Sequence, residues 1–224
     1  MSEASVPEAQ RRAAPINQRI LAAIVAVVAF AAFLWLGFFV KARGEPAIFV
    51  GLERAWVDHS TLVAWWLTQG CYPHVLIPIA VVLLALAWPF PQWRWRIFVS
   101  LAMLLLCWRV ADLFQHVFAR PRRLDWVVKR ETSFSYPSSH AAISTGFYVW
   151  WGVVLYWSEL PRGVRVVGAV ALPLLAMAIC WSRLALGAHY LTDLLGGVLL
   201  AIAIGSVIWA ALGGKVFGAD AGRR

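Results

Sequence analysis

The feature that most constrains this chain is a set of apolar stretches too long for an ordinary soluble domain. Residues 20–40 carry no charged side chain, and as a helix this stretch covers about 30 Å, one hydrocarbon thickness. The whole chain is 62% hydrophobic and 14% charged. A soluble domain is about half apolar and about a quarter charged. The sequence therefore predicts an integral membrane protein.

Further apolar stretches predict an all-α bundle of six membrane-spanning helices. The expected spans are residues 20–40, about 74–89, 97–119, 138–157, 166–181 and 189–212. Between the first two spans, residues 41–60 place apolar side chains at three- and four-residue steps among charged ones. That pattern predicts an amphipathic helix in the membrane interface, directly after the first span.

These boundaries predict one membrane domain between two short tails. Residues 1–19 are polar and are expected to form a disordered cytoplasmic tail. Residues 20–214 form the membrane domain, and residues 215–224 form a second cytoplasmic tail. The first span is too long for a typical signal-peptide core, so we expect it to remain uncleaved.

The basic residues indicate orientation and an anion site rather than nucleic acid. The formal charge is +9, but no basic stripe lies on a soluble face, so we assign the charge to membrane-flanking residues and an anion site. Cationic turns at residues 89–96 and 158–165 favour the cytoplasmic side. Both termini are then cytoplasmic, and the polar motifs described next reach the outer face.

Two short polar motifs stand out among the apolar stretches. The first is Tyr136-Pro-Ser-Ser-His140, and the second runs from Ser182-Arg183 to His189 and Asp193. On a helix, the four-residue spacing of His189 and Asp193 places both side chains on one face. The carboxylate can then accept one ring N–H and leave the other nitrogen free as a nucleophile or base.

The segment before the first motif is the most polar internal part of the chain. It contains Arg120, Arg122 and Arg123, followed by Lys129, and guanidinium forks suit phosphate oxygens. Ser138 is well placed to cap the next helix, whose first backbone N–H groups would bind an anion. A basic cluster with two histidines suggests phosphoryl chemistry.

These residues resemble three sequence blocks of the type 2 phosphatidic acid phosphatases, which share a core with the vanadium haloperoxidases. The third block, S-R-x5-H-x3-D, matches in full at Ser182, Arg183, His189 and Asp193. The second, P-S-G-H, matches at Pro137, Ser138 and His140, with Ser139 in the glycine position.

The first block of the family, K-x6-R-P, matches less well. Gln115 takes the lysine position, Arg122 the arginine and Arg123 the proline. Arg120, Arg123 or Lys129 could supply the charge that the missing lysine leaves out. The resemblance covers residues from about 108 to 212, the expected catalytic core.

The resemblance implies a mechanism without a metal or cofactor. His189 would attack phosphorus and form a phosphohistidine, Asp193 would orient His189, and His140 would protonate the leaving group. The phosphoryl oxygens would be held by Arg122, Arg183, Ser138, Ser139 and Gln115.

The implied function is a lipid phosphate phosphatase at the outer face of a bacterial-type inner membrane. Its partners would be the bilayer and a phosphorylated lipid: polyprenyl pyrophosphate, phosphatidylglycerol phosphate, phosphatidic acid or a glycolipid phosphate. Passing the phosphohistidine to a lipid hydroxyl would make the same protein a phosphotransferase. The incomplete first block leaves a third reading, a non-catalytic lipid-phosphate-binding protein. The sequence favours no oligomeric state.

Overall fold

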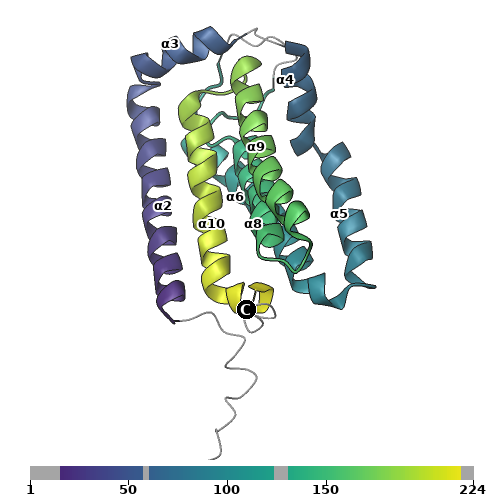
Figure 1. Cartoon of the computed structure of the whole chain (residues 1–224). Helices are drawn as coiled ribbons and strands as arrows, with labels where there is room; N and C mark the ends of the chain where they lie inside the picture. Colours follow the sequence, from purple (N-terminus) through teal and green to yellow (C-terminus); the bar gives the residue numbers. More distant parts are fainter. Residues whose placement is uncertain (1–15, 58–60, 124–130, 218–224) are drawn as a thin grey trace, which may run out of the picture.

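The computed structural model describes residues 16–57, 61–123 and 131–217, and every regular element in these ranges is a helix. Figure 1 shows the long helices as a bundle. In chain order the elements are α2 (Ile16–Arg43), α3 (Ala47–Trp56), α4 (Thr61–Thr68), η1 (Gln69–Cys71), α5 (Pro73–Ala87), η2 (Pro91–Trp93), α6 (Arg94–Phe118), α7 (Ser139–Ser144), η3 (Thr145–Val149), α8 (Trp150–Tyr156), α9 (Arg162–Ala185) and α10 (Leu191–Phe217). The predicted all-α fold is confirmed over these ranges.

Four of the helices are long and apolar enough to cross a membrane: α2, α6 with η2, α9 and α10. The helical pair Thr61–Cys71 and Pro73–Ala87, bent by 43°, makes a fifth candidate if it counts as one span. Large apolar side chains such as Val27, Val167 and Val207 are exposed on these helices. Apolar surface of this extent suits contact with lipid. The chain is therefore a multi-pass membrane protein.

Several helix boundaries differ from the sequence prediction, and α10 runs to Phe217, into the predicted second tail. α2 begins at Ile16, inside the segment expected to be a tail, and α10 begins at Leu191 rather than at His189. His189 therefore lies in the turn before α10. The remaining parts of the predicted tails, residues 1–15 and 218–224, lie outside the described residues.

The helix expected after the first span is α3, which lies across the end of the bundle opposite the first residue of α2 (Figure 1). Ile48, Leu52 and Trp56 are exposed on α3, whereas Glu53 is only 2% exposed. The helix thus directs an acidic side chain toward the protein and apolar side chains outward.

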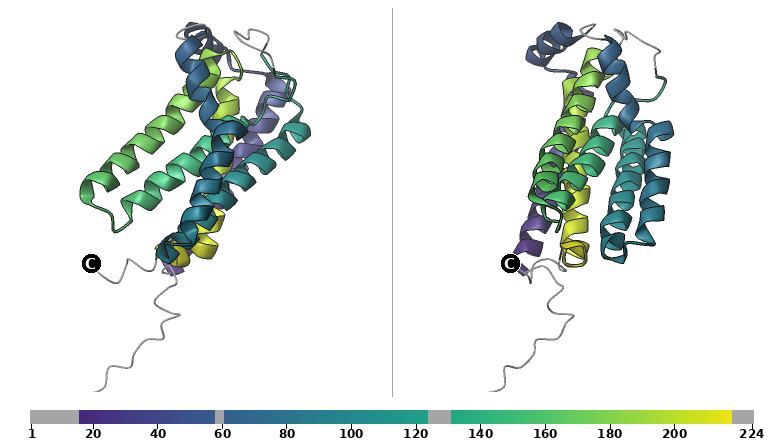
Figure 2. Two further views of the ribbon diagram at one scale, coloured as in Figure 1. Left: turned by 90° about the vertical axis from the view of Figure 1, so that its right-hand side faces the viewer. Right: turned by 45° about the vertical axis from the view of Figure 1, so that its right-hand side comes forward.

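The helix that begins at Ser139 continues without interruption to Tyr156, through the π-helical turn η3. Its last part, α8, packs against α9. In the left view of Figure 2, the α8–α9 pair leans away from α6 and α10. The start of α7 remains against the centre of the bundle, so this helix joins the splayed pair to the core.

Close contacts around Tyr136 and Gly197 position the start of α7. The buried Tyr136 ring stacks on Phe33 of α2 with ring centroids 5.6 Å apart, and its hydroxyl donates to the Phe33 carbonyl oxygen (2.6 Å). A Cβ on Gly197 would lie 2.5 Å from the Ser138 carbonyl oxygen. Because glycine has no side chain, α10 can approach the start of α7 this closely.

Candidate active site

Polar side chains from four separate segments converge at the end of the bundle where α3 lies (Figure 1). All of the sequence-predicted residues in this group are buried. They are Arg122 after α6, His140 in α7, Arg183 near the end of α9, and His189 and Asp193 around the start of α10. The structure thus brings together residues that lie up to 71 positions apart, from Arg122 to Asp193 (193 − 122).

The predicted contact between His189 and Asp193 is present, and its local cause is a helix cap. Nδ1 of His189 lies 3.3 Å from Oδ2 of Asp193, and both side chains are fully buried. Asp193 is the third residue of α10, and its Oδ2 also accepts the backbone N–H of Tyr190 (3.0 Å). The backbone N–H of Tyr190, just before the helix, has no partner inside the helix. The Asp193 carboxylate reaches back and accepts it, as an acidic residue in the first turn of a helix often does.

Asp193 is held by two further donors. Its Oδ1 accepts a guanidinium N–H of Arg120 at 2.6 Å, and its Oδ2 accepts the hydroxyl of Ser135. A buried carboxylate is costly unless it is paired and hydrogen-bonded. These contacts meet that requirement and fix the plane of the carboxylate relative to the imidazole.

The second ring nitrogen of His189 contacts Arg122. Nε2 lies 2.9 Å from Nη1 of Arg122. A guanidinium can only donate, so Nε2 must present its lone pair and Nδ1 must carry the proton. Burial lowers the pKa of His189 to about 4, and the Arg122 charge adds to this effect against the opposing hydrogen bond to Asp193. His189 is therefore a neutral imidazole near pH 7, with the tautomer that nucleophilic attack through Nε2 requires.

Each of the two site arginines is anchored by neutral partners. Arg122 donates to the Ser133 carbonyl oxygen (2.7 Å), the Ser133 hydroxyl (2.8 Å) and the Ala188 carbonyl oxygen (3.1 Å). Arg183 donates to the hydroxyl oxygen of Thr68 (2.9 Å). These hydrogen bonds restrict the rotation of two long, flexible side chains. They hold both guanidinium groups so that they point toward the same place.

That point is occupied by the carboxylate of Glu131. One carboxylate oxygen lies 2.9 Å from Nη2 of Arg122, and the other lies 2.7 Å from Nη2 of Arg183. The Tyr72 hydroxyl also donates to Glu131 (3.1 Å). Burial by itself would raise the pKa of Glu131, but the charges of Arg183 and Arg122 outweigh it and hold this pKa well below its usual value. Glu131 is thus an anion bound by both arginines.

Glu131 was not among the sequence candidates. The one sequence signal for Glu131 is its negative charge, which stands at the end of the strongly basic segment 120–130. Tyr72 was missed as well, because a tyrosine next to a helix-breaking proline carries no catalytic signature. Both residues contact the site only through the folding of distant segments.

His140 lies in the first turn of α7, and the predicted cap of this helix is confirmed. The Ser138 hydroxyl oxygen accepts the backbone N–H of Ala141 (3.4 Å). The Ser138 N–H donates to the Asp193 carbonyl oxygen (2.9 Å), which ties α7 directly to α10. Nε2 of His140 is buried and has no hydrogen-bond partner among the described residues. A buried ring nitrogen without a partner is unfavourable, which marks it as a group that a ligand can satisfy.

Arg120 and Arg123, which were predicted to assist phosphate binding, form ion pairs with other buried acids in this structure. Arg120 pairs with Glu45 (2.9 Å) as well as Asp193, and Arg123 pairs with Glu53 (2.8 Å). All of these side chains are at most 5% exposed. A guanidinium whose charge is neutralised by a buried carboxylate is held away from the anion at Arg122 and Arg183. Lys129, the third proposed auxiliary residue, lies outside the described residues.

Gln115, in the lysine position of the first block, also has a different contact from the one expected. Its side-chain amide donates to the Pro137 carbonyl oxygen (2.9 Å), and the residue is 3% exposed. Gln115 therefore supports the backbone before α7 through one of its amide N–H groups. Ser139 is partly buried as the first residue of α7.

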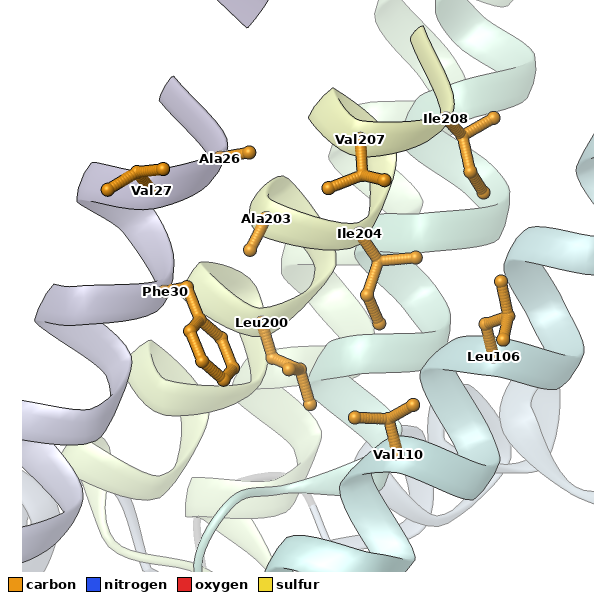
Figure 3. A pocket seen from close by; sticks show the side chains of 10 residues that line it. All are labelled: Ala26, Val27, Phe30, Leu106, Val110, Leu200, Ala203, Ile204, Val207 and Ile208. Atoms are coloured by element: carbon orange, nitrogen blue, oxygen red, sulfur yellow. The ribbon is translucent and has the colours of Figure 1, made fainter. Parts of the chain in front are cut away.

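A groove of about 400 Å³ lies elsewhere, on the flank of the bundle between α2, α6 and α10 (Figure 3). Its walls include Phe30, Val110, Leu200 and Ile204. No titratable side chain lines this groove, so it offers no acid-base or nucleophilic chemistry. Within the described ranges, no cluster of three or more His, Cys, Asp or Glu residues is arranged to hold a metal ion.

Comparison with known proteins shows which family this chain is similar to. The sequence pattern of the PAP2 superfamily matches residues 110–216. Over 128 residues the chain is 31% identical to YbjG of Escherichia coli (strain K12), named as an undecaprenyl-diphosphatase, and the match covers 54% of this chain and 60% of that protein. Over 177 residues it is 27% identical to the decaprenylphosphoryl-5-phosphoribose phosphatase of Mycobacterium tuberculosis (strain H37Rv), covering 77% of this chain and 93% of the relative.

The fold is also similar to a solved structure. The crystal structure of a transmembrane PAP2 type phosphatidylglycerolphosphate phosphatase from Bacillus subtilis aligns with a TM-score of 0.68. The sequences are 21% identical, and the alignment covers 83% of this chain and 94% of that one. This likeness shows that the two chains share a transmembrane fold.

Proposed function

We propose, from the premise that residues 110–216 form a PAP2 superfamily core, that this chain is a metal-independent phosphatase of membrane lipid phosphates. One observation carries the proposal. Arg122 and Arg183 bind the same anion, the Glu131 carboxylate, beside the lone pair of His189. Two fixed guanidinium groups facing an unprotonated imidazole suit the transfer of a phosphoryl group to nitrogen.

In the substrate complex, the phosphoryl group takes the place of the Glu131 carboxylate. Both groups offer two oxygens to a pair of guanidinium forks, and phosphate brings more charge. The Ser138 hydroxyl and the Ser139 backbone N–H, at the start of α7, hold the remaining oxygens. Gln115 supports this arrangement through Pro137 rather than by touching phosphate.

The first chemical step forms a phosphohistidine. Nε2 of His189 attacks phosphorus, the N–P bond forms and the bond from phosphorus to the lipid oxygen breaks. Asp193 accepts the Nδ1 proton as a hydrogen bond and stabilises the positive charge that develops on the ring. His140, protonated in the substrate complex, gives a proton to the leaving oxygen and becomes neutral. Arg122 and Arg183 stabilise the charge spread over the phosphoryl oxygens.

The second step restores the enzyme. Water attacks the phosphohistidine, the N–P bond breaks and inorganic phosphate leaves. His140 takes the proton released by the water, so it returns to the state in which it began. A lipid hydroxyl in place of water would give phosphotransfer through the same intermediate.

The proposed setting is a bacterial-type inner membrane crossed by six spans. Besides the four long helices and the bent α4–α5 pair, the continuous helix Ser139–Tyr156 supplies the remaining crossing. The cationic turns before α6 and α9 lie at the opposite ends of these helices from the site, which supports cytoplasmic termini and a site on the outer face. The exposed apolar side chains of α3 suit the interface beside that site.

Phosphate release by the detergent-purified protein tests this function. The substrates are polyprenyl pyrophosphate, phosphatidylglycerol phosphate, phosphatidic acid and a phosphorylated prenyl-linked sugar, each assayed with EDTA. Prenyl-linked phosphates are tested first because two of the similar proteins are named for such lipids. The comparison is wild type against His189→Ala, with Glu159→Gln as a surface control.

We expect release by wild type and the control, and none by His189→Ala. Acid-labile label on the wild-type protein would identify the phosphohistidine. Retained activity in His189→Ala would overturn the mechanism. Labelling without release, relieved by an added lipid alcohol, would identify a transferase. Lipid binding with neither labelling nor release would leave the non-catalytic binding protein.

A further inference from the structure

Two buried acids, one in the corner between α2 and α3 and one within α3, reach the start of α10. Glu45 accepts the backbone N–H of Thr192 (3.2 Å), and Glu53 accepts the backbone N–H of Leu191 (2.6 Å). These N–H groups lie in the first turn of α10, where no intrahelical partner is available. The helix start next to His189 is therefore bound by carboxylates from a segment more than 130 residues away.

Each acid also binds one arginine of the segment that follows α6. Glu45 contacts Nη2 of Arg120 at 2.9 Å, and Glu53 contacts Nη1 of Arg123 at 2.8 Å. The side chains of Glu45 and Glu53 are 3% and 2% exposed. Buried pairs of this kind are poorly screened by salt. Burial and the neighbouring Glu45 raise the pKa of Glu53 to about 7, so Glu45 supplies most of the negative charge of this pair at neutral pH.

The Glu45 contact continues to the proposed catalytic pair. Arg120 donates through Nη2 to Glu45 and through Nη1 to both Asp193 (2.6 Å) and the Thr192 hydroxyl (2.8 Å). One guanidinium is thus shared between two carboxylates. Without Glu45, the whole positive charge of Arg120 would act on Asp193. Asp193 would then accept the Nδ1–H of His189 less strongly and would be free to turn away from the imidazole ring.

We infer that Glu45 is a positioning residue for the His189–Asp193 pair and acts through Arg120, while Glu53 and Arg123 hold the start of α10 in place. The inference rests on the proposed function for the roles of His189 and Asp193. It extends the active site beyond residues 110–216, the matched family segment. The α2–α3 corner then serves the reaction as well as the fold.

The charges around His189 determine the direction in which its pKa should change when Glu45 is replaced. His189 faces Arg122, Asp193 and Arg183, and Glu131 lies across the site. Glu45 faces Arg120, with Glu53 beside it. Removing the negative charge of Glu45 stabilises the neutral imidazole relative to the imidazolium, so the pKa of His189 must fall.

The test compares Glu45→Gln and Glu45→Asp with Glu159→Gln, an exposed acid that receives the same change. For Glu45→Gln we expect kcat to fall about 10- to 100-fold, by analogy with the hydrogen-bond partners of metal-binding histidines, with KM within about twofold of wild type. Glu45→Asp should recover part of kcat, and the control should match wild type. Wild-type kcat in Glu45→Gln would overturn the inference.

A second measurement does not depend on turnover. The ¹⁵N chemical shifts of the His189 ring report its tautomer and its pKa in the full-length protein. We expect a lower pKa in Glu45→Gln, and more of the tautomer protonated at Nε2. Unchanged shifts would show that Glu45 only caps α10. If wild type hydrolyses no lipid but the shifts move, the positioning role stands and the proposed function fails.

Discussion

Nε2 of His189 lies 2.9 Å from a guanidinium nitrogen of Arg122, so the proposed nucleophilic nitrogen is hydrogen-bonded before any substrate arrives. Because Arg122 also binds Glu131, the proposed nucleophile and the proposed phosphate-binding group are both held in internal contacts. In the proposed mechanism, an incoming phosphate replaces Glu131 on the arginines and draws Arg122 away from Nε2. The contact between Arg122 and Nε2 also keeps the proton of His189 on Nδ1, the tautomer that the proposed attack requires.

The first prediction concerns pH. The pKa of His189 is lowered to about 4, so the ring is neutral from pH 5 upward and becomes protonated as the pH falls through 4. Protonation of His189 should therefore leave the rate of phosphoenzyme formation unaffected above about pH 5 and lower this rate as the pH falls through 4. Rapid-quench labelling across pH 4–8 measures this rate. A rate that declines toward acid pH with a midpoint near the ordinary histidine value of about 6.5 would contradict this prediction.

The second prediction concerns Asp193→Asn. An amide cannot accept the Nδ1–H of His189 as strongly as a carboxylate, and it leaves the charge of Arg120 shared with Glu45 alone. By comparison with the carboxylate of a serine-protease triad, kcat should fall about 10³- to 10⁴-fold, while KM changes little. Steady-state kinetics measure the effect. Asp112→Asn, an exposed change on α6, is the matched control, and equal losses in both variants would refute a specific role.

The third prediction concerns Glu131→Gln. The wild-type carboxylate competes with substrate phosphate for Arg122 and Arg183. Removing its charge should tighten product inhibition by inorganic phosphate about tenfold, since a charge-assisted hydrogen bond contributes about 1.5–3 kcal/mol. Inhibition constants for wild type, Glu131→Gln and Glu159→Gln measure the change. Weaker phosphate binding in Glu131→Gln would show that Glu131 helps to hold substrate instead of competing with it.

The fourth prediction concerns Gly197→Ala. The added Cβ would meet the Ser138 carbonyl oxygen at 2.5 Å and the Ala142 nitrogen at 2.9 Å, both backbone atoms. Pushing α10 from α7 should lower stability by about 1–3 kcal/mol and separate His140 from His189, with loss of kcat. Thermal unfolding in detergent and kinetics measure both effects.

Gly163→Ala, on helix α9, is the control for this change. A Cβ at Gly163 would meet no atom within 4 Å. Alanine should be neutral or stabilising by about 0.5–1 kcal/mol at that position. Wild-type stability and activity in Gly197→Ala would show that the two helices can separate without consequence.

Several features followed from local sequence alone. The uncharged apolar stretches determined the membrane class and the helices, because backbone groups in lipid must be satisfied within the chain itself. Ser138 was identifiable as a cap because its hydroxyl serves the residue three positions later. The pairing of His189 with Asp193 was predictable from their spacing, although the contact comes from a helix cap rather than from one helical face.

Tertiary structure alone decided what each arginine does. Arg120, Arg122 and Arg123 look equivalent in sequence, yet only Arg122 faces the anion site, because Glu45 and Glu53 bind the other two. Local sequence cannot distinguish the three arginines, since each guanidinium pairs with the buried carboxylate that folding brings beside it. Glu45 lies just before α3 and Glu53 lies within it, far from the arginines in sequence. Glu131 is likewise part of the site only because α4 and α9 supply Thr68 and Arg183 around it. The sequence by itself determined the helices and the reactive groups they carry, whereas long-range charge pairing decided which of those groups meet.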